Sequence, residues 1–339
     1  MRLTKKFKVF TAIALTGALV AGCGSATPQK TNNNDKKTET TAKKKIYTSF
    51  YPIYDFTKKI VGDKMDVVNL VPVGSEPHDY ELTANDRKNL ENADAVIYNG
   101  AGMEEWVDDV KDAMKDKKVP FINTSEGITL AEGHHHHHGD AEEEHHEDAK
   151  AEHNDDAKEG HHHDEHVYDP HIWLYPVNAK KQLENIEKAI VNIDPDNKTY
   201  YEENYKKYAA EFDKLDKEYA EQLAPYKDKT IVVSHEAFGY ICRAYGINQK
   251  GIEGLSPESE PSPKKMAEIV DYVKDNGIKV IFFEELVSPK VSEAIAKETG
   301  AKTNMLNPLE GLSDEDMKAG KDYIKVMQEN LKSIVDSFK

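Results

Sequence analysis

The alternation of short apolar runs with amphipathic segments is the feature that most constrains the fold of this chain. Two blocks of such alternation flank one long polar helix, and strands that alternate with helices are typical of parallel sheets in an α/β layer fold. The expected strands are residues 46–49, 67–71, 95–99 and 119–122 in the first block and 230–233, 279–283 and 303–306 in the second. The expected helices are residues 52–61, 84–92, a segment around 106–110, about 179–193, 263–276, 291–298 and one last helix from about 313.

The long polar helix separates the two blocks. Its apolar residues recur at steps of three and four, which predicts one buried stripe on an otherwise solvated helix. These residues are Tyr201, Tyr205, Tyr208, Phe212, Leu215 and Tyr219. The chain is long enough for two domains. We therefore expect an N-terminal domain at residues 46–195, a linking helix at 196–224 and a C-terminal domain at 225–339.

The first residues predict a targeting segment. Basic residues precede an apolar run at 9–20, which is shorter than the ~20 residues of a spanning helix. Residues 20–23, VAGC, then resemble a lipobox, in which the signal is cut before a cysteine that becomes lipid-modified. We expect a signal peptide at 1–22, a lipid on Cys23 and a flexible tether at 23–45, unless the signal is cut elsewhere and Cys23 is incidental. The protein would then be extracytoplasmic and lipid-anchored to the cell membrane, and Cys242 would have no disulfide partner.

Histidines are concentrated in one stretch. Of the fifteen in the chain, twelve lie in residues 132–166, together with thirteen acidic residues and two lysines. This stretch has almost nothing that could pack a core, so we expect a disordered loop. Neutral imidazole is the commonest metal ligand and suits zinc, so the loop could collect several weakly bound zinc ions, sense zinc excess or serve as an inert acidic spacer. The formal net charge of the chain is −17, which argues against nucleic acid as a partner and favours cations.

The other three histidines lie in segments that predict ordered structure. His78 follows one expected strand, His235 ends another, and His171 precedes a helix. In open parallel sheets, ligands bind beyond the carboxyl ends of the strands, so these side chains could meet in a cleft between the two domains. With Glu310, which follows the expected strand 303–306, they would make a complete tetrahedral zinc set. The alternatives are a surface loop position for His78 and structural, hydrogen-bonded roles for His171 and His235.

The sequence pattern does not determine the fourth donor of this set. Glu284 and Glu285 end another expected strand and compete with Glu310, and spacing along the chain does not decide between them. Glu76 lies near His78 and is a further alternative to Glu310, as is water.

Three segments carry a resemblance to a known family: GSEPHDYE at 74–81, DPHIWL at 169–174 and SHEAFGY at 234–240. Together and in this order they resemble the zinc-uptake solute-binding lipoproteins of ABC transporters, the zinc type of the cluster A-I metal-binding family, over about residues 45–339. The resemblance implies two (β/α)4 domains joined by a single rigid helix, and a histidine-rich loop between the first and second segments. It implies His78, His171 and His235 as ligands, with a carboxylate, here Glu310, or water as the fourth. Manganese-type members have Glu in place of the third histidine, so His235 points to zinc.

The resemblance also implies a function. The protein would capture Zn2+ outside the cell, close its cleft with small motions and deliver the ion to an ABC permease, acting as a monomer. No phosphate-binding loop of the type GxxxxGK[ST] occurs in the chain, so a separate subunit would hydrolyse ATP. The alternatives are a manganese-preferring uptake protein, a zinc-dependent hydrolase and a structural or adhesive zinc protein. An enzyme is not expected, because no HExxH motif occurs and four protein ligands would fill the zinc coordination shell.

Overall fold

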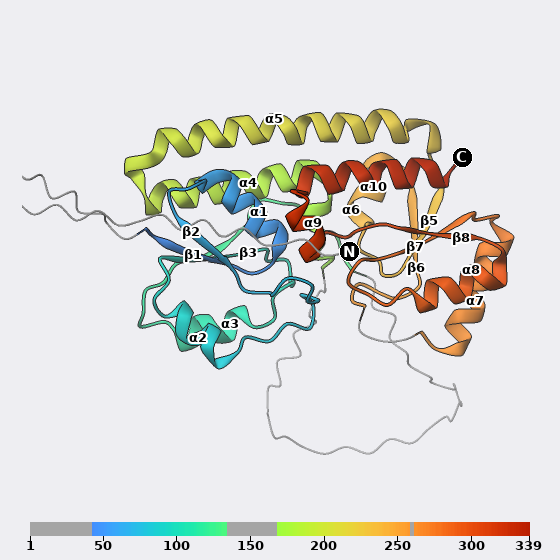
Figure 1. Ribbon diagram of the computed structural model, residues 1–339, viewed down its shortest axis with the longest axis horizontal. Helices are drawn as coiled ribbons and strands as arrows, with labels where there is room; N and C mark the ends of the chain where they lie inside the picture. The colour runs from blue at the N-terminus through green and yellow to red at the C-terminus, as the bar shows by residue number, and fades with distance from the viewer. Residues whose placement is uncertain (1–42, 134–167, 258–260) are drawn as a thin grey trace, which may run out of the picture. The chain divides into compact units, whose positions relative to one another are not determined.

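Two parallel four-stranded sheets form the framework of the protein (Figure 1). The computed structural model describes residues 43–133, 168–257 and 261–339. The first sheet has the order β2-β1-β3-β4, with β1 at Lys45–Thr48, β2 at Asp66–Asn69, β3 at Ala95–Tyr98 and β4 at Phe121–Asn123. The second has the order β6-β5-β7-β8, with β5 at Thr230–Val233, β6 at Asn248–Gly251, β7 at Val280–Phe283 and β8 at Lys302–Met305. The predicted α/β class with parallel sheets is confirmed.

Helices cover both faces of the first sheet (Figure 1). They are α1 at Tyr51–Val61, α2 at Ala84–Leu90, α3 at Val107–Ala113 and α4 at Pro176–Ile193. Alternate strand residues point to opposite faces. Ile46 and Ile97 therefore pack in the core that contains α1 and α4, and Val96 packs in the core that contains α2 and α3. Thr83 caps α2 through a reciprocal pair of bonds with Asp86.

The second sheet is covered by α6 at Gly239–Tyr245, α7 at Pro263–Asp275, α8 at Lys290–Thr299 and α10 at Tyr323–Ser337. The sequence pattern missed α6 and β6. Strand β6, with the sequence NQKG, is a polar edge strand without an apolar alternation, and α6 has only seven residues.

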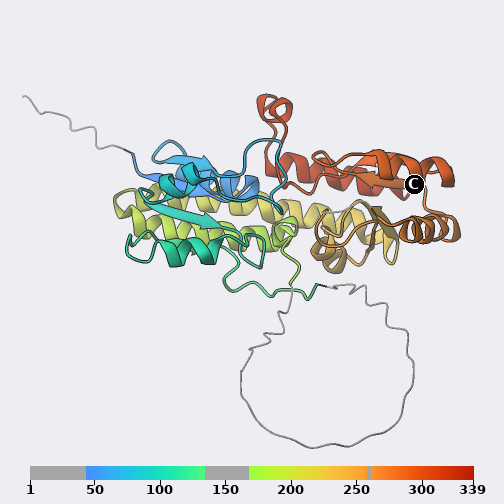
Figure 2. The same cartoon turned by 90° about the horizontal axis from the view of Figure 1, so that it is seen from below.

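The single last helix that we expected from about Ser313 is wrong. Helix α9, at Asp314–Lys318, is separate from α10 because Gly320 has a φ of 71° and Asp322 caps a new helix. Figure 2 shows α9 projecting away from α10. Met317 of α9 is 39% exposed, so α9 does not continue the buried stripe of α10.

Helix α5, at Lys198–Leu223, packs against α4 and α1 of the first half and against α10 and α6 of the second (Figure 1). Its 26 residues span ~39 Å at 1.5 Å per residue, long enough to run past both sheets. Of the predicted stripe, Tyr205 and Tyr208 are half-buried and the other four residues are buried. One uninterrupted helix therefore joins the halves, which confirms the predicted connection.

Several expectations concern residues outside the described ranges. These are the signal peptide at 1–22, Cys23, nearly all of the tether at 23–45, and residues 134–166 of the histidine-rich stretch. In the described ranges, none of the helices combines the length and apolar character that crossing a membrane requires. Cys242 is buried and is not in a disulfide.

Candidate metal centre

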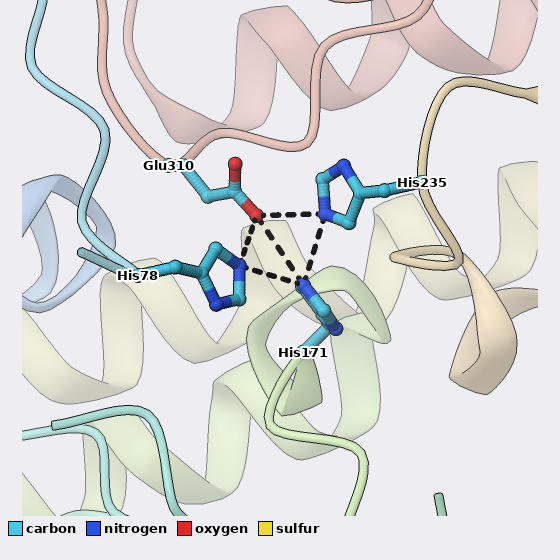
Figure 3. Close-up of side chains that lie close together, drawn as sticks. All are labelled: His78, His171, His235 and Glu310. Carbon is cyan, nitrogen blue, oxygen red and sulfur yellow. Dashed lines mark hydrogen bonds and ion pairs between the residues drawn. The ribbon is translucent and has the colours of Figure 1, made fainter. Parts of the chain in front are cut away.

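Four side chains from distant parts of the chain converge on one point (Figure 3). They are His78, His171, His235 and Glu310, and one potential ligand atom from each lies within 4.8 Å of all the others. The Nε2 atom of His171 lies 3.3 Å from that of His78 and 3.1 Å from that of His235. The Oε1 atom of Glu310 lies 3.2 Å from His78 Nε2, 3.1 Å from His235 Nε2 and 3.3 Å from His171 Nε2.

These spacings suit one small cation. Four tetrahedral ligands at ~2.0–2.2 Å from a zinc ion lie ~3.3–3.6 Å from one another. The five separations above fall at or just below this range. All four side chains are withdrawn from solvent, with His78 the most exposed at 6%. The cluster is thus the right size for one cation, and its negative charge comes from a single carboxylate.

His171 is held by a carboxylate two residues before it. Asp169 Oδ1 lies 2.9 Å from His171 Nδ1 and accepts a hydrogen bond from the His171 backbone N–H at 3.1 Å. Burial lowers the pKa of His171, but Asp169 and Glu310 outweigh burial and raise that pKa above its ordinary value. Because Nδ1 is occupied by Asp169, Nε2 faces the other three side chains of the cluster, an arrangement common among metal-binding histidines.

His235 has the same kind of support from the neighbouring strand. Glu284, which directly follows β7, lies 2.8 Å from His235 Nδ1 through Oε2 and accepts from the His235 backbone N–H through Oε1 at 3.1 Å. Burial lowers the pKa of His235, whereas Glu284 and Glu310 raise it well above its ordinary value. The carboxylate of Glu284 is therefore engaged with His235 and lies outside the four-residue cluster.

Glu310 lies in a buried loop, residues 306–312, that follows β8. The loop is fixed by Asn330, whose amide donates to the Asn307 carbonyl at 2.6 Å and whose oxygen accepts from the Asn307 N–H at 2.9 Å. Glu285 accepts from the Asn307 side chain at 2.6 Å and from the Ser313 N–H at 3.3 Å. Glu285 thus supports the loop and is not part of the cluster. Burial raises the pKa of Glu310, but the three histidines outweigh burial and hold it well below its ordinary value.

His78 is supported differently from the other two histidines. It lies in the loop between β2 and α2, and its backbone N–H donates to Glu76 Oε1 at 3.1 Å. Burial and the charge of Glu310 raise the pKa of Glu76 to about 8. Glu76 is near the cluster but is not one of its four members.

The sequence pattern missed one residue that supports this centre. Asp169 is part of the DPHIWL segment, but we gave it no role. A carboxylate two residues before a candidate ligand is the signal that could have identified it, since such side chains commonly orient metal-binding histidines.

Comparison with known proteins identifies the family. A family model described as "Zinc-uptake complex component A periplasmic" matches residues 46–337. The chain belongs to this family. It is 44% identical over 333 residues to the "High-affinity zinc uptake system protein ZnuA" of Bacillus subtilis (strain 168), covering 98% of each chain. The resemblance inferred from the three segments is therefore confirmed.

A second relative has a longer chain. The "Zinc-binding lipoprotein AdcA" of Streptococcus pneumoniae (strain ATCC BAA-255 / R6) is 41% identical over 306 residues, which are 89% of this chain and 57% of AdcA. Among solved structures, the Zn(II)-bound ZnuA-like domain of Streptococcus pneumoniae AdcA matches with a TM-score of 0.71 and 38% identity, covering 87% of this chain and 98% of that domain. The family's two-sheet architecture is thus shared over almost the whole described chain.

Proposed function

We propose that this protein is the extracytoplasmic zinc-binding component of an ABC importer and that its cargo binds to His78, His171, His235 and Glu310. The observation that carries the proposal is the convergence of three imidazole nitrogens and one carboxylate oxygen within 4.8 Å of one another, with five of the six separations at 3.1–3.3 Å. Nitrogen donors with a carboxylate suit zinc. The names of the relatives, which describe zinc uptake and zinc binding, support the same cargo.

The donor set favours zinc over manganese. Manganese prefers oxygen-rich sites, whereas three of the four candidate donors here are imidazoles. His235 is the ligand that distinguishes the two types, and its Nδ1 is fixed by Glu284. These donors therefore do not support the alternative of a manganese-preferring uptake protein.

The same arrangement argues for a carrier rather than a hydrolase. Catalytic zinc sites keep one coordination position open for water, whereas four protein ligands would close a tetrahedral shell. Glu284, one acid close enough to serve as a general base, has both oxygens engaged with His235. We propose binding and release, without catalysis, as the activity of this centre.

Delivery requires partners that the chain itself does not contain. We propose that the protein is a monomer that docks on a membrane permease, and that a separate ATPase subunit drives transport. We further propose that Cys23 carries the lipid anchor to the cell membrane, which the description of AdcA as a lipoprotein supports. Residues 46–195 and 225–339 would form the two lobes, with residues 196–224 between them.

Competitive metal titration with native mass spectrometry tests the cargo and the site. The protein without residues 134–166, which could bind further ions, should bind one zinc ion tightly and prefer it to Mn2+. His235→Ala should lose most of that affinity, because one of four donors is gone. A preference for Mn2+ in the unsubstituted protein, or tight zinc binding that survives His235→Ala, would show that the proposal is wrong.

A further inference from the structure

The second and third metal-binding segments touch each other outside the metal centre. Gly239, the first residue of α6, lies four residues after His235. A Cβ atom at this position would lie 2.6 Å from Asp169 Oδ2, closer than real Cβ contacts allow. Its φ lies outside the left-handed region, so other residues could adopt this backbone conformation. Space for the Asp169 carboxylate, and for the Arg243 guanidinium whose Nη1 would lie 3.2 Å from the same Cβ, is therefore the physical reason for glycine here.

The Asp169 carboxylate cannot move aside without cost. Its Oδ1 atom binds both the backbone N–H and the ring Nδ1 of His171, at 3.1 and 2.9 Å. Its Oδ2 atom accepts from Arg243 of α6 at 3.4 Å. The residue is only 2% exposed, so water cannot easily replace these bonds. Any displacement of the carboxylate would disturb the bonds that orient His171.

The backbone of Asp169 is fixed as well. Its N–H donates to the Ala131 carbonyl at 2.9 Å, and its carbonyl accepts from the Tyr240 hydroxyl at 2.9 Å. The same hydroxyl accepts from the Ala131 N–H at 3.0 Å. A methyl group at position 239 therefore meets a residue whose main chain is held on two sides, and the carboxylate has to take up the displacement.

We propose that Gly239 is a positioning residue for the metal centre: its missing side chain lets α6 seat the Asp169 carboxylate that aims His171 Nε2 at His235 and Glu310. The inference rests on the proposed zinc-binding function and extends it. The segment that supplies one ligand, His235, also determines through Gly239 where a second ligand points. The two segments thus act as one interlocked unit before a metal ion arrives.

The substitution Gly239→Ala tests this directly, with Gly254→Ala as its matched control. A Cβ at Gly254 would have no atom within 4 Å, and its φ is not in the left-handed region. Both variants keep all four candidate ligands. We expect Gly239→Ala to lose about 10- to 100-fold in zinc affinity, the usual effect of disturbing a residue that orients a ligand. Gly254→Ala should bind zinc as the unsubstituted protein does.

A double-mutant cycle with Asp169 separates this role from a general loss of structure. Asp169→Ala should lose affinity to a similar extent, and the double variant Asp169→Ala/Gly239→Ala should lose no more, because the carboxylate that the methyl group displaces is already absent. Asp169→Asn keeps an acceptor oxygen for His171 Nδ1 and should lose less. The visible spectrum of bound Co2+ reports coordination geometry, and Gly239→Ala should weaken the strong bands of tetrahedral cobalt.

Several results would overturn the inference. Zinc affinity and a cobalt spectrum like those of the unsubstituted protein in Gly239→Ala would show that the contact does not position His171. Additive losses in the double variant would show that Gly239 acts through another residue. If Gly239→Ala does not fold, as judged by circular dichroism, unchanged zinc affinity in Asp169→Ala would still reject the role of the carboxylate. Failure of the unsubstituted protein to bind zinc would overturn the proposed function itself, which these other outcomes leave intact.

Discussion

At the scale of single residues, the centre consists of donors and of the acids that aim them. Of the acids that were candidates for the fourth position, the three that follow expected strands have different tasks in the structure. Glu310 points into the cluster, Glu284 holds His235, and Glu285 holds the loop that carries Glu310. Substitution of each acid therefore tests a different role.

The substitution Glu284→Gln should weaken zinc binding without abolishing it. The amide keeps the size of the side chain but removes the charge beside His235 Nδ1, and such changes typically cost about 10- to 100-fold in metal affinity. Isothermal titration with a competing chelator measures the change. Glu105→Gln, at an exposed position, is the control and should have no effect. Complete loss of binding in Glu284→Gln would indicate that Glu284 is itself a ligand.

Zinc binding should release protons and weaken in acid. Burial lowers the pKa of His171 and His235, but Asp169, Glu284 and Glu310 outweigh burial and raise both above the ordinary value of 6.5. In the metal-free protein, the stability that these raised pKa values contribute is present below pH 6.5 and is lost as pH rises through the folded-state values. Zinc binds only the neutral imidazoles, so zinc affinity rises as pH rises through the same range.

Titration in buffers of different ionisation enthalpy measures this coupling. The observed binding enthalpy should vary with the buffer at pH 7, and zinc affinity should fall between pH 7.5 and 5.5. A binding enthalpy that is the same in all buffers would contradict the coupling, because no proton would then leave the site.

At the scale of elements, the loop after β8 determines whether Glu310 reaches the histidines. Asn330 on α10 makes two hydrogen bonds to the backbone of Asn307 and is 3% exposed. Leu309 has a φ of 59°, an unfavourable value for a residue with a Cβ, so neighbouring contacts are needed to hold the loop in this shape.

The substitution Asn330→Ala should therefore loosen this loop. It leaves a buried N–H and a buried C=O without partners, which costs roughly 1–3 kcal/mol for each unsatisfied group. Urea unfolding of the metal-free protein should show the loss of stability, and zinc titration should show weaker binding. If stability falls but zinc affinity does not, the loop does not depend on Asn330 to place Glu310.

At the scale of the whole described chain, the two halves share one apolar core along α5. Phe56 of α1, Phe212 of α5 and Tyr323 of α10 contact one another in edge-to-face or tilted arrangements, with ring centroids 4.9–5.4 Å apart. Lys59 of α1 also binds Asp322, the cap of α10, at 2.8 Å. These contacts tie the two sheets to one helix, which supports our expectation that the lobes move little when the cargo binds.

Removal of the Phe212 ring should destabilise both halves together. Phe→Ala substitutions in cores typically cost about 3–5 kcal/mol. Since the shared core joins the halves, thermal unfolding of Phe212→Ala should remain a single transition at lower temperature. Val177→Ala, at a position that is 44% exposed, is the control and should change stability little. Two separate transitions in Phe212→Ala would mean that each half folds without the shared core.

Deletion of residues 134–166 should leave the tight site intact. The residues that flank this stretch are already paired with each other, since Glu132 and Tyr168 form a β-bridge. A short linker can therefore replace the deleted residues without moving Asp169 or His171. Competitive titration should show an unchanged tight zinc site and fewer weakly bound ions. Loss of the tight site would show that the deleted residues supply one of its ligands.

Most of the helices and strands, and the candidate donors, can be predicted from local sequence patterns. Apolar periodicity is a local property, so it located the buried strands and the helix stripes, and the three histidine segments were visible as motifs. Apolar periodicity did not reveal β6 and α6, because both are short and β6 is also polar. It also did not reveal the break between α9 and α10.

Which of these groups meet depends on how the chain packs in three dimensions. Glu284, Glu285 and Glu310 all follow expected strands, and spacing along the chain does not fix which carboxylate points into a cleft. That choice depends on the pairing of β7 with β8 and on the bonds that shape the loop around Glu310. The contact between Gly239 and Asp169 joins residues seventy positions apart, so only packing of α6 against the segment before α4 reveals it.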